Sequence, residues 1–108
     1  MEDIEYVGVN ELKDSDKADL EKLCAEYYGK VKRKIKNITH LKIHVKDHGK
    51  GGKSKFSIHV HVSAPTRFFE STASDWDFAR TLHMAFNEVE KQIEHAFHDD
   101  TKFYEHKK

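Results

Sequence analysis

Three histidines occur at alternate positions in two short segments that are rich in β-branched residues. His44 lies in segment 40–46, and His59 and His61 lie in segment 55–63. Both segments alternate apolar and polar residues, which predicts two strands whose histidines share one face. Such a face has the chemistry of a divalent-metal site, of a surface that stacks on RNA, or of a solvated surface that gains charge near pH 6.5. Because neither segment carries an acidic residue at the matching parity, we expect solvated histidines and no bound metal, with these three as the candidate ligands.

A run of cations, GKVKRKIKN over residues 29–37, forms the second candidate site. It ends an expected helix over 16–35, where the helix dipole favours each cation by about 0.3–1 kcal/mol. More lysines follow in the next strand and in the glycine-rich segment 47–54. A cationic stripe shared by several elements indicates contacts with RNA phosphates and salt-dependent binding. The candidate RNA-binding residues, which include two cations of the last helix, are Lys30, Lys32, Arg33, Lys34, Lys36, Lys42, Lys46, Lys50, Lys53, Lys55, Arg80 and Lys91.

Motifs for catalysis are missing from the sequence. It contains no GxSxG nucleophile elbow, Walker loop, HExxH pair or CxxC pair. The segment HGKGGKS, residues 48–54, lies between two expected strands, whereas a phosphate-binding loop joins a strand to a helix. The single cysteine, Cys24, falls on the apolar stripe of a helix, which favours a buried, unreactive thiol. We therefore expect no enzyme activity, no cofactor and no small-molecule substrate.

Composition limits the fold and the partners. Hydrophobic residues make up 37% and charged residues 35% of the 108 residues, which suits one domain with a thin core. Lys+Arg and Asp+Glu both count 19, so a generic polyanion binder is disfavoured while a local basic patch is allowed. No apolar run reaches the roughly 20 residues that span a bilayer, and the acidic start lacks a signal-peptide core. We expect a cytoplasmic protein that has no membrane partner.

Periodicity predicts the order strand, helix, three strands, helix. The expected elements are a strand over 4–9, a helix over 16–35 capped by Ser15 or Asp14, strands over 40–46, 55–63 and 66–73, and a helix over 74–97. Only the fourth strand has ambiguous parity, because Phe68 and Phe69 are adjacent. Asp77 or Ser74 can cap the last helix by accepting backbone N–H groups of its first turn.

Each helix has one apolar stripe that must be buried. The expected buried residues are Leu20, Leu23, Cys24, Tyr28, Val31 and Ile35 in the first helix, and Leu82, Ala85, Phe86, Val89, Ile93 and Phe97 in the second. The two middle strands also have one apolar face each. These patterns predict an α+β fold of order β-α-β-β-β-α, a four-stranded sheet with both helices packed on one face and the other face wet. The domain is expected over 1–98, with a short charged C-terminal tail over 99–108.

This order and these residues resemble the ribosome hibernation promoting factor and ribosome-associated inhibitor A family. The resemblance covers nearly the whole chain and is densest in the second helix, where Asp77 stands at the family's acidic cap. Further matches are the apolar pattern Leu82, Ala85, Phe86 and Val89, the ending Lys91-Gln92-Ile93, the segment from Ile35 to Val45, and Ser57-Ile58-His59-Val60. The chain resembles a short form, because the long forms add a C-terminal extension that dimerises.

The resemblance implies a non-catalytic factor that binds the small ribosomal subunit through its rRNA, occupies the messenger and transfer RNA channel, and silences translation under stress. It also implies a monomer off the ribosome. Two other functions stay open from the residues alone. One is a general binder of structured or double-stranded RNA, and the other is a metal-binding protein that uses the histidine face.

Overall fold

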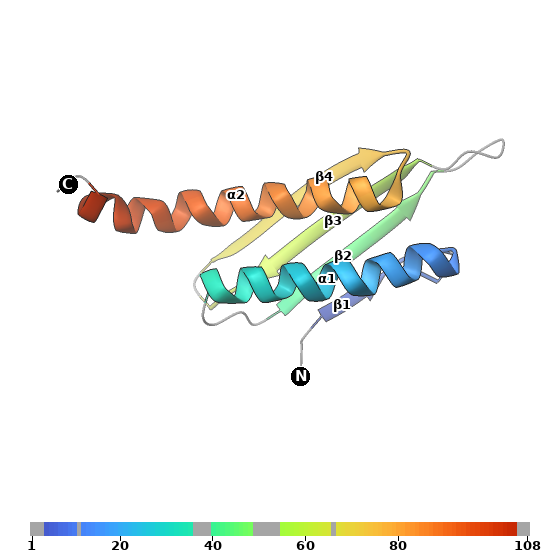
Figure 1. Cartoon of the computed structure of the whole chain (residues 1–108), viewed down its shortest axis with the longest axis horizontal. Helices are drawn as coiled ribbons and strands as arrows, with labels where there is room; N and C mark the ends of the chain where they lie inside the picture. The colour runs from blue at the N-terminus through green and yellow to red at the C-terminus, as the bar shows by residue number, and fades with distance from the viewer. Residues whose placement is uncertain (1–3, 11, 36–39, 49–54, 66, 106–108) are drawn as a thin grey trace.

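A four-stranded sheet carries both helices on one face (Figure 1). The computed structural model describes residues 4–10, 12–35, 40–48, 55–65 and 67–105, with side chains of the last segment described as far as residue 96. The elements are β1 (Ile4–Val7), α1 (Asp14–Lys34), β2 (His40–Asp47), β3 (Phe56–Ser63), β4 (Phe68–Asp75) and α2 (Phe78–Glu105). The strands lie in the order β1-β2-β3-β4, with β1 parallel to β2 and the other pairs antiparallel. The predicted α+β fold of order β-α-β-β-β-α is therefore confirmed.

Strand alternation separates a dry face from a wet face, as the sequence predicts. In β2 and β3 the apolar residues are buried against the helices, and Ile43 pairs in register with Val60. The ambiguous parity of β4 is decided by its pairing with β3, which places Phe69 opposite Val62 and inside the core. Phe68 consequently points to the wet face. Ser71, also inward, donates a 2.6 Å hydrogen bond from its hydroxyl to the carbonyl of Ala85 in α2.

Helix α1 begins without the side-chain cap that the sequence suggests. Lys13 is the N-cap residue and makes no side-chain cap hydrogen bond, so the expectation of Ser15 or Asp14 as cap is wrong. The helix begins at Asp14, and Asp14 and Asp16 lie in its first turn, where the helix dipole favours acidic groups. The expected stripe is buried apart from Leu23, which is half-buried. The structure adds Tyr27 to the buried set, because its side chain packs against α2.

Helix α2 has the predicted cap. The Arg80 backbone N–H donates to Asp77 Oδ1 at 3.0 Å, and the Thr81 hydroxyl donates to the Asp77 carbonyl at 2.6 Å. The helix begins at Phe78 because residues 74 and 75 still belong to β4. It extends to Glu105, so most of the segment expected as a tail, 99–108, continues the helix. Its core residues are fully buried at Leu82, Ala85, Phe86, Val89 and Ile93, whereas Phe97 lies outside the described side chains.

None of the helices in the described residues combines the length and apolar composition needed to cross a membrane.

Two glycines make a matched pair of predictions. Gly8 has φ +78°, and a Cβ there would collide with the backbone carbonyl oxygen of Val45. Gly29 lies inside α1, and a Cβ there meets nothing within 4 Å. We expect Gly8→Ala to lower the free energy of unfolding by at least about 1–2 kcal/mol, the cost of the left-handed backbone alone. We expect Gly29→Ala to raise it by about 0.5–1 kcal/mol. Urea unfolding of both variants checks the signs, and equal shifts would contradict the assigned backbone.

Candidate functional site

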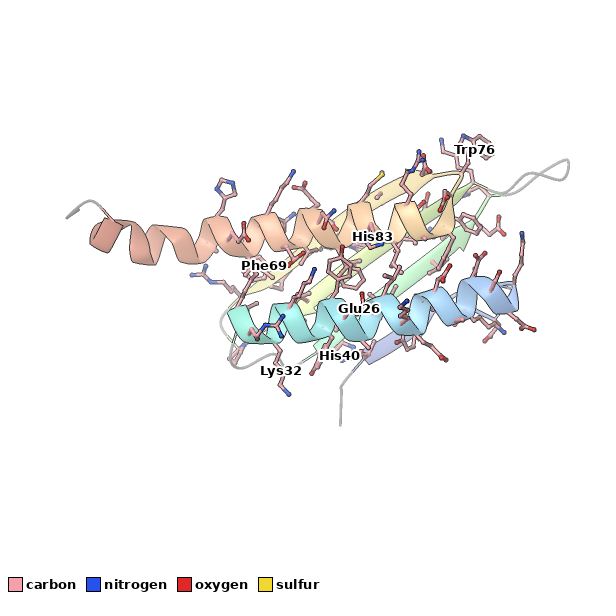
Figure 2. All side chains as sticks on the ribbon, viewed as in Figure 1. Glu26, Lys32, His40, Phe69, Trp76 and His83 are labelled. Carbon is pink, nitrogen blue, oxygen red and sulfur yellow. The ribbon has the colours of Figure 1, made fainter. Side chains whose placement is uncertain are left out.

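The last turns of α1 carry four exposed cations, Lys30, Lys32, Arg33 and Lys34, which we call the α1 basic cluster. Two of them lie over rings of the same helix. Lys30 Nζ is 4.9 Å from the centroid of the Tyr27 ring, and Lys32 Nζ is 5.9 Å from that of Tyr28. Figure 2 shows Lys32 projecting from this end of α1. The two lysines therefore lie over aromatic rings that are themselves buried.

Only one member of the α1 basic cluster pairs with a carboxylate in the part of the chain that the structure describes. Lys34 Nζ lies 2.7 Å from Glu94 Oε2 on α2. The hydrogen bond from Lys34, aided by its charge, lowers the pKa of the Glu94 carboxyl below its ordinary value. This pair therefore stabilises the fold near neutral pH, and its contribution is lost as the pH falls through the lowered pKa. Because Lys30, Lys32 and Arg33 have no carboxylate partner among the described residues, they are available to an anion from outside.

Tyr27 holds the two helices together beneath the cluster. Its ring stacks on Phe86 with centroids 4.6 Å apart and an interplanar angle of 2°. Its hydroxyl lies 2.8 Å from His83 Nδ1 and donates to Asn87 Oδ1 at 3.2 Å. Burial raises the pKa of the Tyr27 phenol, and the charges of Glu90 and Glu26 add to the shift. The phenol is therefore a neutral structural group that fixes the surface under Lys30.

The other predicted cations do not join this cluster. Lys42 and Lys46 point to the wet face of the sheet, where Lys42 pairs in register with Glu5 and His61. Lys46 lies near the end of β2 and Lys55 directly before β3. Both are therefore far from the start of β2, because eight strand residues span about 26 Å. The predicted RNA-binding residues Lys36, Lys50 and Lys53 lie outside the described residues.

The two predicted cations of α2 are also separate from the cluster. Arg80 lies in the first turn, with Nε 3.9 Å from Asp75 Oδ2, and Lys91 is exposed farther along the helix. The expected single stripe therefore divides among the α1 basic cluster, the wet face and α2. The physical reason is that β2 runs away from the end of α1 while its lysines alternate onto the far side.

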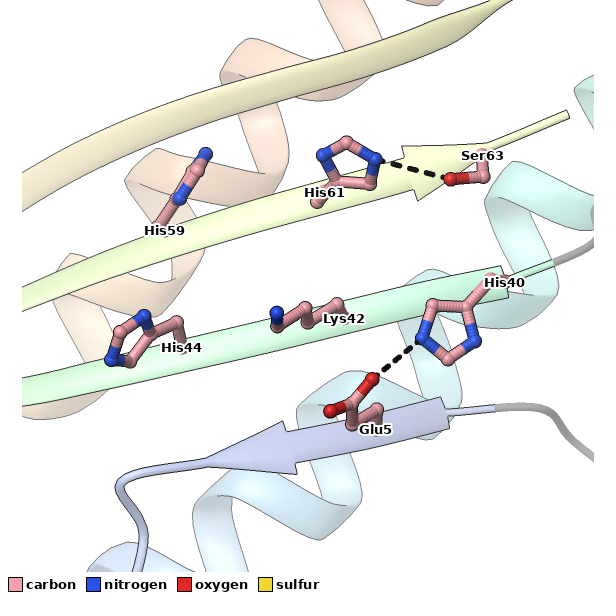
Figure 3. Close-up of a pocket in the computed structure, with 7 residues that line it drawn as sticks. All are labelled: Glu5, His40, Lys42, His44, His59, His61 and Ser63. Atoms are coloured by element: carbon pink, nitrogen blue, oxygen red, sulfur yellow. Dashed lines mark hydrogen bonds and ion pairs between the residues drawn. The ribbon is translucent and has the colours of Figure 1, made fainter.

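The predicted histidine face exists and is hollowed (Figure 3). His44, His59 and His61 share the wet face, as expected, and His44 pairs in register with His59. A shallow hollow of about 280 Å³ is lined by Glu5, His40, Lys42, His44, His59, His61 and Ser63. A second, of about 320 Å³, is lined by His44, Lys46, His48, Ser57, His59 and Thr72. His40 and Glu5 were not among the predicted site residues, although both have the parity of the wet face.

Three histidines of this face have polar partners, and two of them lie near the same carboxylate oxygen, since His61 Nδ1 is 3.8 Å from Glu70 Oε1. His59 Nε2 lies 2.7 Å from Glu70 Oε1, and His40 Nε2 lies 2.9 Å from Glu5 Oε1. His61 Nε2 lies 3.1 Å from the Ser63 hydroxyl. Across the described ranges, no three His, Cys, Asp or Glu side chains form a group that could hold a metal ion. The face thus offers hydrogen-bonding groups and flat rings to a ligand.

Cys24 is fully buried, as its position on the apolar stripe predicts.

The fold and these two surfaces define an α+β protein with a basic helix end and a polar, imidazole-rich sheet face. Comparison of the chain with protein-family models and with curated proteins gave no match. The chemistry of the site therefore carries the functional argument.

Proposed function

We propose that this protein is a non-catalytic, ribosome-associated factor that binds the small ribosomal subunit through rRNA and silences translation. The observation that carries the proposal is the α1 basic cluster, in which Lys30, Lys32 and Arg33 have no carboxylate partner among the described residues. Unpaired cations on a rigid helix are suited to phosphate contacts, which supply most of the affinity for a folded RNA. The α+β order with both helices on one face agrees with the fold that the resemblance implies.

The acidic surface of α2 restricts the proposed contact. Glu88, Glu90 and Glu94 follow one another along the helix, and the first and last are exposed. Glu94 is paired with Lys34, whereas Glu88 and Glu90 repel phosphates, so we propose that rRNA contacts the end of α1 rather than both helices. A ribosomal partner also implies a cytoplasmic location and a monomer when the protein is off the ribosome.

Co-sedimentation with purified small subunits tests the proposal. We expect the protein to pellet with them and to lose about 20- to 40-fold in affinity between 50 and 200 mM salt, the response to three phosphate contacts. Large subunits and a perfect RNA duplex serve as controls. Equal binding to the duplex would favour the general RNA binder, and absent or salt-independent pelleting would contradict a phosphate-mediated ribosome contact. Inhibition of translation in a purified system, at a stoichiometric amount of protein, tests the silencing itself.

A further inference from the structure

Two large aromatic side chains lie exposed at opposite ends of β4. Phe68 begins the strand and Trp76 directly follows it, and each is 60% exposed. Phe68 stacks on His61 of the neighbouring strand, with centroids 5.3 Å apart and ring planes 13° apart. Lys55 Nζ, directly before β3, lies 5.9 Å from the Trp76 ring. Figure 2 shows Trp76 at the end of the sheet far from Phe69, the buried neighbour of Phe68. Each exposed ring therefore lies beside a polar side chain, Phe68 beside His61 and Trp76 beside Lys55.

Polar hollows occupy the wet face between these ends. The hollow lined by His40 and Lys42 and the one lined by Lys46 and His48 share His44 and His59, so the two hollows are adjacent along β2 and β3. The two carboxylates on this face are already engaged, Glu5 by His40 and Glu70 by His59. Lys42 and Lys46 have no ion-pair partner within the described residues. The hollows are therefore lined by two lysines that can contact phosphates without breaking an ion pair of the described residues.

We propose that the wet face of the sheet binds single-stranded RNA. Bases stack on the Phe68–His61 pair and on Trp76, and phosphates contact Lys42, Lys46 and Lys55. Exposed rings that are separated along a strand suit unpaired bases, because bases inside a duplex are stacked on each other and cannot reach them. Eight strand residues span about 26 Å, which accommodates several nucleotides. Lysines that make no ion pair among the described residues are available to the phosphate backbone.

This inference goes beyond the proposed ribosome contact. The wet face is on the opposite side of the sheet from the helices that carry the α1 basic cluster (Figure 1). A single-stranded segment can consequently lie on the sheet while the helical side contacts folded RNA. The two surfaces make separate predictions and can fail separately.

Titration with a ten-nucleotide oligouridine tests the inference. Trp76 is the only tryptophan of the chain, so its intrinsic fluorescence reports directly on stacking. In 0.1 M salt we expect saturable quenching, and an anisotropy change of the labelled oligonucleotide with the same midpoint. Phe68→Ala and Trp76→Ala should each weaken binding at least about fivefold, the effect of losing one stacked base. Lys42→Gln combined with Lys46→Gln should reduce the salt slope by about 1.4.

Three controls separate stacking from other causes. Met84→Ala removes an apolar side chain of α2 that is 40% exposed, and it should leave oligonucleotide binding unchanged. Thermal unfolding should show that each variant is folded. Charge reversal at Lys30, Lys32 and Arg33 should leave oligouridine binding within twofold, because charges beyond about 10 Å are largely screened at this salt. The Phe68→Ala variant should in turn pellet with small subunits like the wild type.

Several results would overturn the inference. These are an absence of quenching and anisotropy change up to 100 µM protein, unchanged affinity in both ring variants, and equal binding of an RNA duplex. Equal binding of polyglutamate would also overturn it, because a face that accepts any polyanion does not read bases.

Discussion

Phe86→Ala is expected to lower the free energy of unfolding by about 3–5 kcal/mol, the usual cost of removing a buried aromatic ring. The Phe86 side chain is fully buried in the middle of α2 and stacks on Tyr27 of α1. Its removal leaves a cavity between the helices and the sheet. The Tyr27 ring, whose hydroxyl contacts His83 and Asn87, also loses its stacking partner. A domain of this size has about 5–15 kcal/mol of stability in total, so the loss is a large fraction of it.

Thermal and urea unfolding measure this loss. For a domain of about this length, each kcal/mol corresponds to roughly 4–8 °C, so the midpoint should fall by at least about 12 °C. Phe68→Ala is the matched control, because the same side chain is removed from a position that is 60% exposed. Its effect should stay within about 0.5 kcal/mol. Similar losses in both variants would show that the core does not depend on the stack between Tyr27 and Phe86.

Charge reversal at Lys30, Lys32 and Arg33 is expected to weaken small-subunit binding by about tenfold or more in 0.1 M salt. The three cations are exposed and have no carboxylate partner among the described residues, so they are available to phosphates. The salt slope should also fall by about 2–3, because each lost phosphate contact removes close to one counterion. Lys34 is left in place because it pairs with Glu94.

Reversal at Lys13, Lys17 and Lys22 provides the control on the same helix. It changes net charge equally but lies in the first half of α1, where the helix dipole favours acidic side chains. Charge reversal at Lys30, Lys32 and Arg33 places acidic groups at the helix C-terminus, where the dipole opposes them. A variant with glutamine at the same three positions should therefore be tested beside it, with thermal unfolding of both followed by circular dichroism. Binding that falls equally in the N-terminal control would indicate a response to net charge alone, and unchanged binding in the C-terminal variant would remove the α1 basic cluster from the site.

The two surfaces differ in how far sequence could predict them. The wet-face histidines were predicted correctly because strand alternation depends only on position within one segment. Tyr27 was missed as a buried residue, although its spacing from Cys24 and Val31 would have placed it on the apolar stripe. The exposed Phe68 could not be separated from Phe69, because both rings suit a strand and only pairing decides which points inward.

Local sequence patterns were sufficient to predict the order of elements, the α+β class, the cap at Asp77 and the apolar faces of both helices. Each of these depends on residues close in the chain, through helical or strand periodicity or a local hydrogen bond. Tertiary structure alone decided the parity of β4, the stack between Tyr27 and Phe86, and the division of the cations between two sides of the sheet. Those features depend on strand register and chain direction, which are properties of contacts between distant segments.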